Sequence, residues 1–402
     1  MKDSGIEWIG EVPERWEIQK LKYYATVTSG EILSKDEYVF SGDIPVIGSN
    51  GKIGTTYKSN NHSEVITTGR VGTIGTAQIV QDAWITDNAL IIKSHSISRP
   101  FLTYVIPNFD FKFMLSGTAQ PLITATKLKN QYIPVPSSEV QDKLVQYLNT
   151  QIFNLSHLIS QVCSSIELYK KLKQAVITQA VTKGVRGERE MKDSGVEWIG
   201  AIPKDWEIKR LKSFCTIVDC KNRTPDVFPD GKYTVVRTTC IKDCSFSYEG
   251  SYQTDTTNFK AWTLKGQPHK GDIFFTREAP VGEACLVPNA DNLCMGQRVM
   301  FFRPEDNSDA RYIMYSIYGP LVREYIASKN SGSTVGHLKL GQVACIPIFY
   351  CPPLEQKEIA DYLDAKCAEI DGLVAKKEQL VKELESYKKS LIYEVVTGKR
   401  EV

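Results

Sequence analysis

The chain has 402 residues, too many for one ordinary hydrophobic core, so its length predicts two globular units with additional helical material. Its 49 Lys and Arg residues stand against 47 Asp and Glu residues, and this near balance neither favours nor excludes a nucleic-acid partner. The amino-terminal sequence MKDSGIEWIGEVPERWEIQK lacks the apolar core of a signal peptide, and no later stretch has the length and hydrophobicity of a membrane span. We therefore expect a cytoplasmic protein whose ten cysteines are reduced thiols.

An internal repeat sets the organisation of the chain. The sequence MKDSGIEWIGEVPERWEIQKLK at Met1 returns as MKDSGVEWIGAIPKDWEIKRLK at Met191. A second repeated block starts as QDKLVQYLNTQI at Gln141 and as QKEIADYLDAKC at Gln356. The segments that these blocks frame have diverged, whereas the blocks themselves have not. We interpret this pattern as a common scaffold that carries two individual recognition domains.

The framed segments consist of short β-branched or aromatic runs broken by Gly, Pro and Asn, which predicts strands joined by turns. Such runs are IPVIGSNGKIGTTY, EVITTGRVGTIGTAQIV and WITDNALIIK in residues 22–136, and YTVVRTTCI, GDIFFTREAPVGEACLV and MGQRVMFFRP in residues 212–351. Helices are expected near residues 101–115 and 309–328. Each segment is therefore predicted to form a mixed, mainly β domain.

The second repeated block has the spacing of a coiled-coil seam, in which apolar residues alternate at steps of four and three. In the first copy the seam is Leu148, Ile152, Leu155, Ile159, Val162, Ile166 and Tyr169. In the second copy it is Leu363, Cys367, Ile370, Val374, Lys377, Val381 and Leu384, with one charged residue. The stop signals Lys183-Gly184 and Gly398-Lys399 predict two helices of about forty residues each.

A helix with one apolar stripe needs a partner, and the closest partner for each copy is the other copy. We therefore predict an α+β protein in which an antiparallel coiled coil separates two domains related by a pseudo-two-fold repeat. The predicted domains are 1–136 and 191–351, and the helical parts are 137–190 and 352–402. In the alternative, each stripe packs on its own domain as a surface helix, but helices in compact domains average only about a dozen residues.

The chain resembles the specificity subunit of a Type I restriction-modification system over its whole length. The resemblance is carried by the pattern DSGxEWIGxxPxxWE, present at residues 3–17 and again at 193–207. It is also carried by a helix that starts with Glu355-Gln356 and continues with Tyr362-Leu363. The first helix departs from this pattern, because Val140-Gln141 stands at its start.

The resemblance implies a subunit without catalysis that binds a bipartite, asymmetric site in double-stranded DNA, one half per target recognition domain, with a spacer measured by the helices. It further implies two methylation subunits that dock on the helices and methylate adenine N6 with S-adenosylmethionine. Restriction subunits add ATP-driven translocation and Mg²⁺-dependent cleavage in such complexes. No cofactor is expected on this chain itself.

Residues that can reach base edges or phosphates gather in the loops of both domains. Residues 20–135 hold 11 Lys and Arg against 8 Asp and Glu, and residues 209–350 hold 18 against 14, a modest excess of positive charge that phosphate binding requires. The candidates in the first domain are Ser49, Asn50, Lys52, Arg70, Thr73, Gln120 and Lys127. Those in the second domain are Lys221, Asn222, Arg223, Thr224, Arg237, Thr238, Thr239, Arg277, Gln297 and Arg298. The alternative for Arg70 and Arg277 is an ion pair that closes a turn.

No catalytic or metal-binding motif stands out in the sequence. GRVGTIG lacks the lysine of a phosphate loop and is interpreted as a turn, and Asp230-Gly231-Lys232 is interpreted as a hairpin turn. The Asn/Asp-Pro-Pro-aromatic signature of an adenine methyltransferase is missing, and the cysteine spacings do not match a zinc site. Two rival functions remain: a self-contained nuclease or methyltransferase with unrecognised motifs, and a structural adaptor that binds protein rather than DNA.

Overall fold

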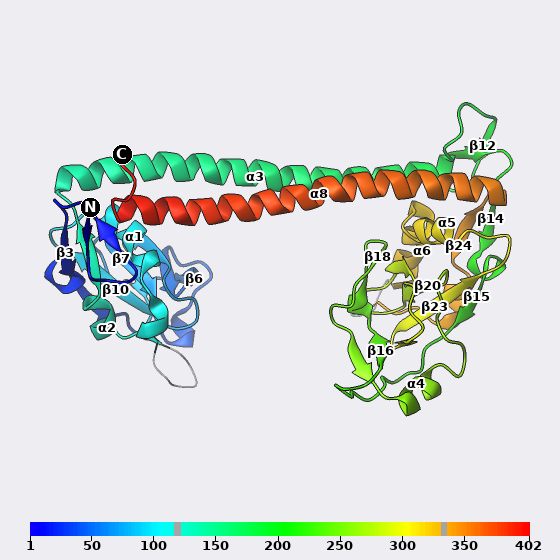
Figure 1. The fold of residues 1–402 in the computed structure, drawn as a ribbon, viewed down its shortest axis with the longest axis horizontal. Helices are drawn as coiled ribbons and strands as arrows, with labels where there is room; N and C mark the ends of the chain where they lie inside the picture. Colours follow the sequence, from blue (N-terminus) through cyan, green and yellow to red (C-terminus); the bar gives the residue numbers. More distant parts are fainter. Residues whose placement is uncertain (116–121, 331–335) are drawn as a thin grey trace. The chain divides into compact units, whose positions relative to one another are not determined.

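The computed structural model describes residues 1–115, 122–330 and 336–402 and divides the chain into two compact units. Unit 1 consists of Met1–Cys163 and Glu378–Val402, and unit 2 consists of Ser164–Lys377. The division falls within the two long helices, α3 (Ser138–Lys183) and α8 (Pro353–Val396). Each unit therefore combines one β-rich domain with one segment from each long helix (Figure 1).

Unit 1 is organised by a four-stranded antiparallel sheet with the order β4–β10–β7–β8. Its strands are β4 (Ala25–Ser29), β7 (Val65–Gly69), β8 (Ala77–Val80) and β10 (Ala89–Ser94). In a second sheet, β5 (Ile44–Gly48) pairs antiparallel with β6 (Gly51–Thr56) and parallel with β9 (Trp84–Ile85). Two-stranded pairs are formed by β1 (Lys2–Asp3) with β2 (Glu11–Val12) and by β3 (Glu17–Lys20) with β11 (Tyr132–Val135).

Unit 2 has the same strand order, sheet by sheet. The four-stranded sheet β15–β23–β20–β21 consists of β15 (Cys215–Val218), β20 (Ile273–Thr276), β21 (Ala284–Leu286) and β23 (Val299–Pro304). In the second sheet, β16 (Tyr233–Val236) pairs antiparallel with β19 (Tyr252–Thr254) and parallel with β22 (Leu293–Met295). The two-stranded pairs are β12 (Met191–Asp193) with β13 (Ala201–Pro203) and β14 (Glu207–Arg210) with β24 (Pro347–Tyr350).

One hairpin distinguishes the two β-rich domains. In unit 2, β17 (Ile241–Lys242) pairs with β18 (Ser245–Phe246), and the part of unit 1 that the structure describes has no such pair. The mixed α+β class predicted from the sequence is confirmed by this architecture. The turn at Asp230-Gly231-Lys232 is not a hairpin, however, because it leads into β16, which pairs with β19 and β22 rather than with the preceding strand.

Short helices complete each domain. The expected helix at residues 101–115 is α1 (Arg99–Val105) followed by two 3-10 turns, and the one at 309–328 is α5 (Ala310–Ile317) followed by α6 (Pro320–Asn330). Three helices were not predicted from the sequence, namely α2 (Ala125–Lys129), α4 (Thr256–Trp262) and α7 (Leu340–Ala344). In unit 2, α5 and α6 lie between the long-helix segments and the strands β20 and β23 (Figure 1).

In unit 1, segments from both long helices share a core with the first β-rich domain. Leu144 and Leu148 of α3 lie in one buried cluster with Leu391 and Val395 of α8. The ammonium group of Lys388 also donates to Ser156 Oγ at 2.9 Å. The end of α8 therefore packs on the first domain, which precedes it by more than 200 residues in the chain.

In unit 2, the other halves of the same helices pack against each other and on the second domain. Ile177 and Val181 of α3 share a buried cluster with Ile359 and Leu363 of α8. Lys173 forms an ion pair with Asp371 at 2.6 Å, and the ammonium of Lys377 lies 5.6 Å from the centre of the Tyr169 ring. In both units, residues nearer the end of α3 contact residues nearer the start of α8. The two helix segments therefore run antiparallel within each unit.

The predicted seam positions are all shielded from solvent at least in part. Leu148, Val162, Ile166, Leu363, Cys367 and Ile370 are buried, and Ile152, Leu155, Ile159, Val374, Val381 and Leu384 are half-buried. The charged seam residue Lys377 places its ammonium over an aromatic ring, a favourable position for a cation. Within each unit the two long helices contact each other. In the alternative, each apolar stripe would pack on its own domain alone.

A buried glutamine fixes the start of each long helix. Gln356 Oε1 accepts a hydrogen bond from Asp309 N at 3.0 Å, while its Nε2 donates to Cys351 O at 2.9 Å. Gln141 does the same with Ser98 N at 2.8 Å and with a carbonyl five residues before it. Because Ser98 and Asp309 are the N-caps of α1 and α5, each glutamine joins a long helix to a short helix of its own domain.

Candidate DNA interface

Three loops of each domain meet at one end of the four-stranded sheet. In unit 1 they follow β5, follow β7 and precede β10. Arg70 N donates to Asn88 O at 2.9 Å, which joins the second loop to the third, and Thr76 Oγ1 donates to Ser49 O at 3.0 Å, which joins the second to the first. The segment GRVGTIG connects β7 to β8, in agreement with its interpretation as a turn. The candidates from these separate loops are thereby brought together.

The candidates in unit 1 differ in how accessible they are. Asn50, Lys52 and Thr73 are exposed and Ser49 is half-buried. Arg70 is half-buried as well, and its Nη1 donates to Asp87 O at 3.3 Å. These residues form a small polar edge at which Lys52 and Arg70 supply positive charge.

Of the remaining two candidates of unit 1, only Lys127 lies among the described residues. Lys127 directs its ammonium to the carbonyl oxygens of Met114 and Leu115, at 3.0 and 3.3 Å, so it closes a backbone turn. Gln120 lies outside the described residues.

In unit 2 the basic turn that precedes β16 is held against an aromatic ring. The Lys221 ammonium and the Arg223 guanidinium lie 4.7 and 5.3 Å from the centre of the Trp262 ring. The indole of Trp262 donates to Arg223 O at 3.1 Å. Asn222 and Thr224 of this turn are exposed. The turn therefore presents two cations from a fixed platform at the end of α4.

The loop after β16 carries Arg237, Thr238 and Thr239, which correspond to Gly48 at the end of β5 and to Ser49 and Asn50 in the loop that follows it. Arg237 and Thr239 are exposed, Thr238 is half-buried, and Arg237 Nη1 makes a 3.4 Å contact with Gly250 O. Gln297 in the loop before β23 is half-buried.

Arg277 does not have the exposed position that the sequence suggested. It is only 8% exposed, and its guanidinium donates to Asp219 Oδ1 at 3.2 Å and to Asn222 Oδ1 at 3.1 Å. The ion-pair alternative describes it better than a DNA contact does. By these bonds Arg277 supports the basic turn from behind and leaves the surface to its neighbours.

Beside Arg277, a carboxylate joins two exposed side chains. Glu278 Oε2 lies 3.1 Å from Arg298 Nε, and Glu278 Oε1 lies 2.5 Å from His337 Nδ1. Sequence reasoning found Arg298 but missed Glu278 and His337, and it missed exposed Asn88 in unit 1. The repeat offered a signal for Asn88, because WITDNALII aligns with CMGQRVMFF and places Asn88 opposite Arg298.

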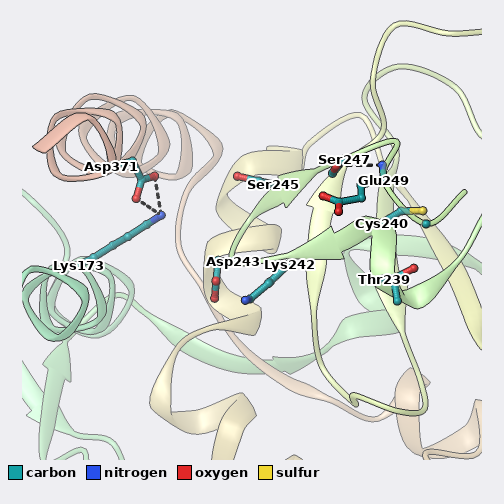
Figure 2. Close-up of a pocket in the computed structure, with 10 residues that line it drawn as sticks. Lys173, Thr239, Cys240, Lys242, Asp243, Ser245, Ser247, Glu249 and Asp371 are labelled. Atoms are coloured by element: carbon teal, nitrogen blue, oxygen red, sulfur yellow. Dashed lines mark hydrogen bonds and ion pairs between the residues drawn. The ribbon is translucent and has the colours of Figure 1, made fainter. Parts of the chain in front are cut away.

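A cavity of about 680 Å³ lies on another side of unit 2, between the β17–β18 hairpin and the long helices. Figure 2 shows Lys173 and Asp371 on the helices facing Lys242, Asp243 and the adjoining loop. Two lysines and three carboxylates, including Glu249, line it, so it has no excess positive charge to hold a phosphate. We do not assign it to the DNA interface.

Within residues 1–115, 122–330 and 336–402, no three His, Cys, Asp or Glu side chains are grouped to hold a metal ion. The ten cysteines are all free thiols in the structure. Over the same described ranges, no helix combines the length and the apolar character needed to cross a membrane.

One scaffold is used twice in this chain, with different side chains at the same loops. The model of the Type I restriction modification DNA specificity domain matches this chain at residues 13–168 and again at 203–383. Because these matches span most of the sequence, the chain belongs to this family. It is a specificity subunit of the type I restriction-modification class, and such subunits are non-catalytic.

Relatives of known class agree with this assignment. The chain is 25% identical to a putative type I restriction enzyme MjaX specificity subunit of Methanocaldococcus jannaschii, over 97% of this chain and 95% of the relative. It is 24% identical to the type I restriction enzyme MjaVIII specificity subunit of the same organism, over 78% of this chain and 71% of the relative. A chain from a solved structure of the type I R-M system shares the fold, with a TM-score of 0.70 at 15% identity, over 97% of this chain and 100% of that one.

Proposed function

We propose that this chain reads a bipartite, asymmetric sequence in double-stranded DNA, one half with each β-rich domain. The observation that carries the proposal is the shared strand order of the two domains together with different side chains at matching loops. A common backbone places both sets of loops alike, whereas exposed Asn50, Lys52 and Asn88 face one half-site and Arg223, Arg237 and Arg298 face the other. Different donors and acceptors select different bases, so the two half-sites should differ.

We further propose that α3 and α8 form a continuous antiparallel coiled coil that sets the spacing of the half-sites, with the domains 1–136 and 191–351 related by a pseudo-two-fold axis. The antiparallel contacts within each unit support this, from Lys388 with Ser156 in unit 1 to Lys173 with Asp371 in unit 2. In symmetric dimers that read DNA, half-sites lie about 34 to 36 Å apart on one face of the duplex. The segments 137–190 and 352–402 would supply the corresponding spacer here.

The partners we propose are two methylation subunits docked on the long helices, joined by restriction subunits. Apolar side chains remain exposed on α3, where Phe153 is 73% and Leu168 is 65% exposed, and such exposure is typical of a surface that another protein covers. S-adenosylmethionine, ATP and Mg²⁺ would enter through those subunits. The protein would act in the cytoplasm, where the DNA is.

The test is to incubate the purified chain with DNA, Mg²⁺ and S-adenosylmethionine, with and without methylation subunits. We expect adenine methylation only when the methylation subunits are present, and we expect the methylated adenines to lie in one two-part sequence. Methylation or cleavage by the chain alone would instead establish a self-contained enzyme.

Salt dependence separates DNA reading from a structural adaptor. A domain that neutralises several phosphates loses affinity steeply as the salt concentration rises, because it displaces counterions. We expect the affinity for a duplex that contains the methylated sequence to fall by at least tenfold between about 50 and 200 mM salt. No measurable binding to any duplex, at any salt concentration, would favour the adaptor.

A further inference from the structure

Backbone hydrogen bonds and isolated bridges match three positions of the second domain to three positions of the first. Arg277 N donates to Arg298 O at 3.0 Å, as Arg70 N does to Asn88 O, so Arg298 matches Asn88. An isolated antiparallel bridge joins Glu278 to His337, and an equivalent bridge joins residues 71 and 122. Unit 1 therefore holds Val71, Leu122 and Asn88 where unit 2 holds a carboxylate, an imidazole and a guanidinium.

In unit 2, the carboxylate of Glu278 holds the side chains of Arg298 and His337 in place. Glu278 is 18% exposed, whereas the side chains of Arg298 and His337 are 47% and 40% exposed. Its carboxylate receives Arg298 through Nε at 3.1 Å, and the two Nη groups lie at the far end of the same guanidinium. A guanidinium held through Nε presents both Nη groups side by side, which is the geometry of a bidentate donor.

The backbone at Arg298 supports the same role. Its φ is +78°, in the left-handed region that side chains with a Cβ rarely adopt. Residues held in such conformations gather at binding sites, where a fixed direction of the side chain justifies the strain. Arg298 thus combines an unusual backbone, an anchored Nε and an exposed end.

Resting on the proposed DNA-reading function, we propose that Arg298 reads a guanine in the second half-site through O6 and N7 in the major groove. Glu278 is the positioning residue that holds the guanidinium, and His337 completes the support on the other carboxylate oxygen. At the matching place in the first domain, the exposed amide of Asn88 suits adenine, which offers an acceptor at N7 and a donor at N6. The same structural position thereby reads a different base in each half-site.

The test uses the full chain with its methylation subunits in a host, where sequencing of methylated adenines gives both half-sites. We expect Arg298→Ala to relax one guanine position of the second half-site, with discrimination falling about tenfold to a hundredfold. Arg298→Lys should relax the same position, because an ammonium keeps the charge but loses the fork. Glu278→Gln should relax it less, and Asn88→Ala should relax an adenine position in the first half-site only.

The unchanged half-site shows in each case that the variant folds and assembles. Arg210→Ala is a matched control, because Arg210 is an exposed arginine of β14, which lies outside the four-stranded sheet. A phosphate contact would give a different result: Arg298→Ala would weaken methylation at all sequences alike, and Arg298→Lys would restore it. That outcome, or unaltered base preferences in Arg298→Ala, overturns the assignment.

Failure of the proposed function looks different. If the wild-type complex yields no two-part methylated sequence, both the DNA-reading function and the role of Arg298 are wrong. If the sequence appears and contains no guanine that depends on Arg298, only the second is wrong.

Discussion

Arg277 donates to both carboxylate oxygens of Asp219, at 3.2 and 3.3 Å, across 58 residues of sequence. The pair lies where β15 ends and β20 ends, and the same guanidinium reaches Asn222 in the basic turn at 3.1 Å. A buried ion pair is costly to break from one side, because the remaining charge keeps its desolvation penalty. The pair therefore links the stability of unit 2 to the shape of its DNA-facing turn.

We predict that Arg277→Ala destabilises unit 2 by about 2 kcal/mol, the range for a lost hydrogen bond to a charged group. Thermal unfolding followed by circular dichroism measures this, and the Arg277→Ala, Asp219→Asn double variant should recover part of the loss because no charge is then left unpaired. DNA affinity should also fall, through the released turn. A variant that melts like the wild type but binds DNA poorly would restore Arg277 as a direct contact.

The buried glutamines should contribute to stability for a related reason. Replacing Gln356 by Met keeps the volume but leaves Asp309 N and Cys351 O without their partners, and each unsatisfied buried group costs about 1 to 3 kcal/mol. We predict a loss of about 2 to 4 kcal/mol in urea unfolding. Gln141→Met should behave alike in unit 1, where the bonds are the same. If only one variant were destabilised, the two helix starts would not be equivalent in energy.

The sequence predicted the features that repeat or have a long period. Two copies of one block predicted two domains of one plan, and the strand orders β4–β10–β7–β8 and β15–β23–β20–β21 correspond. The stripe of apolar residues predicted both long helices, because forty residues contain enough turns for a period to be recognised. The helices α2 and α7 were missed, since five residues contain hardly more than one turn.

The accessibility of single side chains was beyond sequence reasoning. Arg277 was chosen because it is a charged residue in a loop. Its partner Asp219 is distant in the chain, so only the fold identifies the pair. Lys127 was chosen for the same reason and instead caps carbonyl groups. Asn88 was overlooked because the loop between β9 and β10 that holds it has no basic residue. Which of the candidates contact DNA remains a prediction.

Packing of the long helices can be tested with two leucines of α3 in unit 1. Leu148 is fully buried among residues of both long helices and the first domain, whereas Leu158 is 42% exposed. We predict that Leu148→Ala costs about 2 to 5 kcal/mol through lost contacts and a residual cavity, while Leu158→Ala stays within about 0.5 kcal/mol. Equal effects in urea unfolding would mean that this part of α3 does not pack as described.

Thiol reactivity gives an independent check on burial. Burial raises the pKa of Cys294 and of Cys351 to about 12 and raises the pKa of Cys285 further, so these thiols hold their protons at pH 8. Because only the thiolate reacts with a disulfide reagent such as DTNB, the three should be inert in the folded chain. Cys163 on α3 is exposed, and we predict that it accounts for the fast phase of the reaction.

Replacing Cys163 by Ser should remove that fast phase. Unfolding the wild-type chain in urea should make all ten thiols react. At pH 9 the buried thiols should still be almost entirely protonated and should react slowly, because their pKa values lie far above this pH. Rapid reaction of Cys294 or Cys351 in the folded chain would contradict the burial of β22 and of the segment just before α8, since a thiol must reach solvent to be modified.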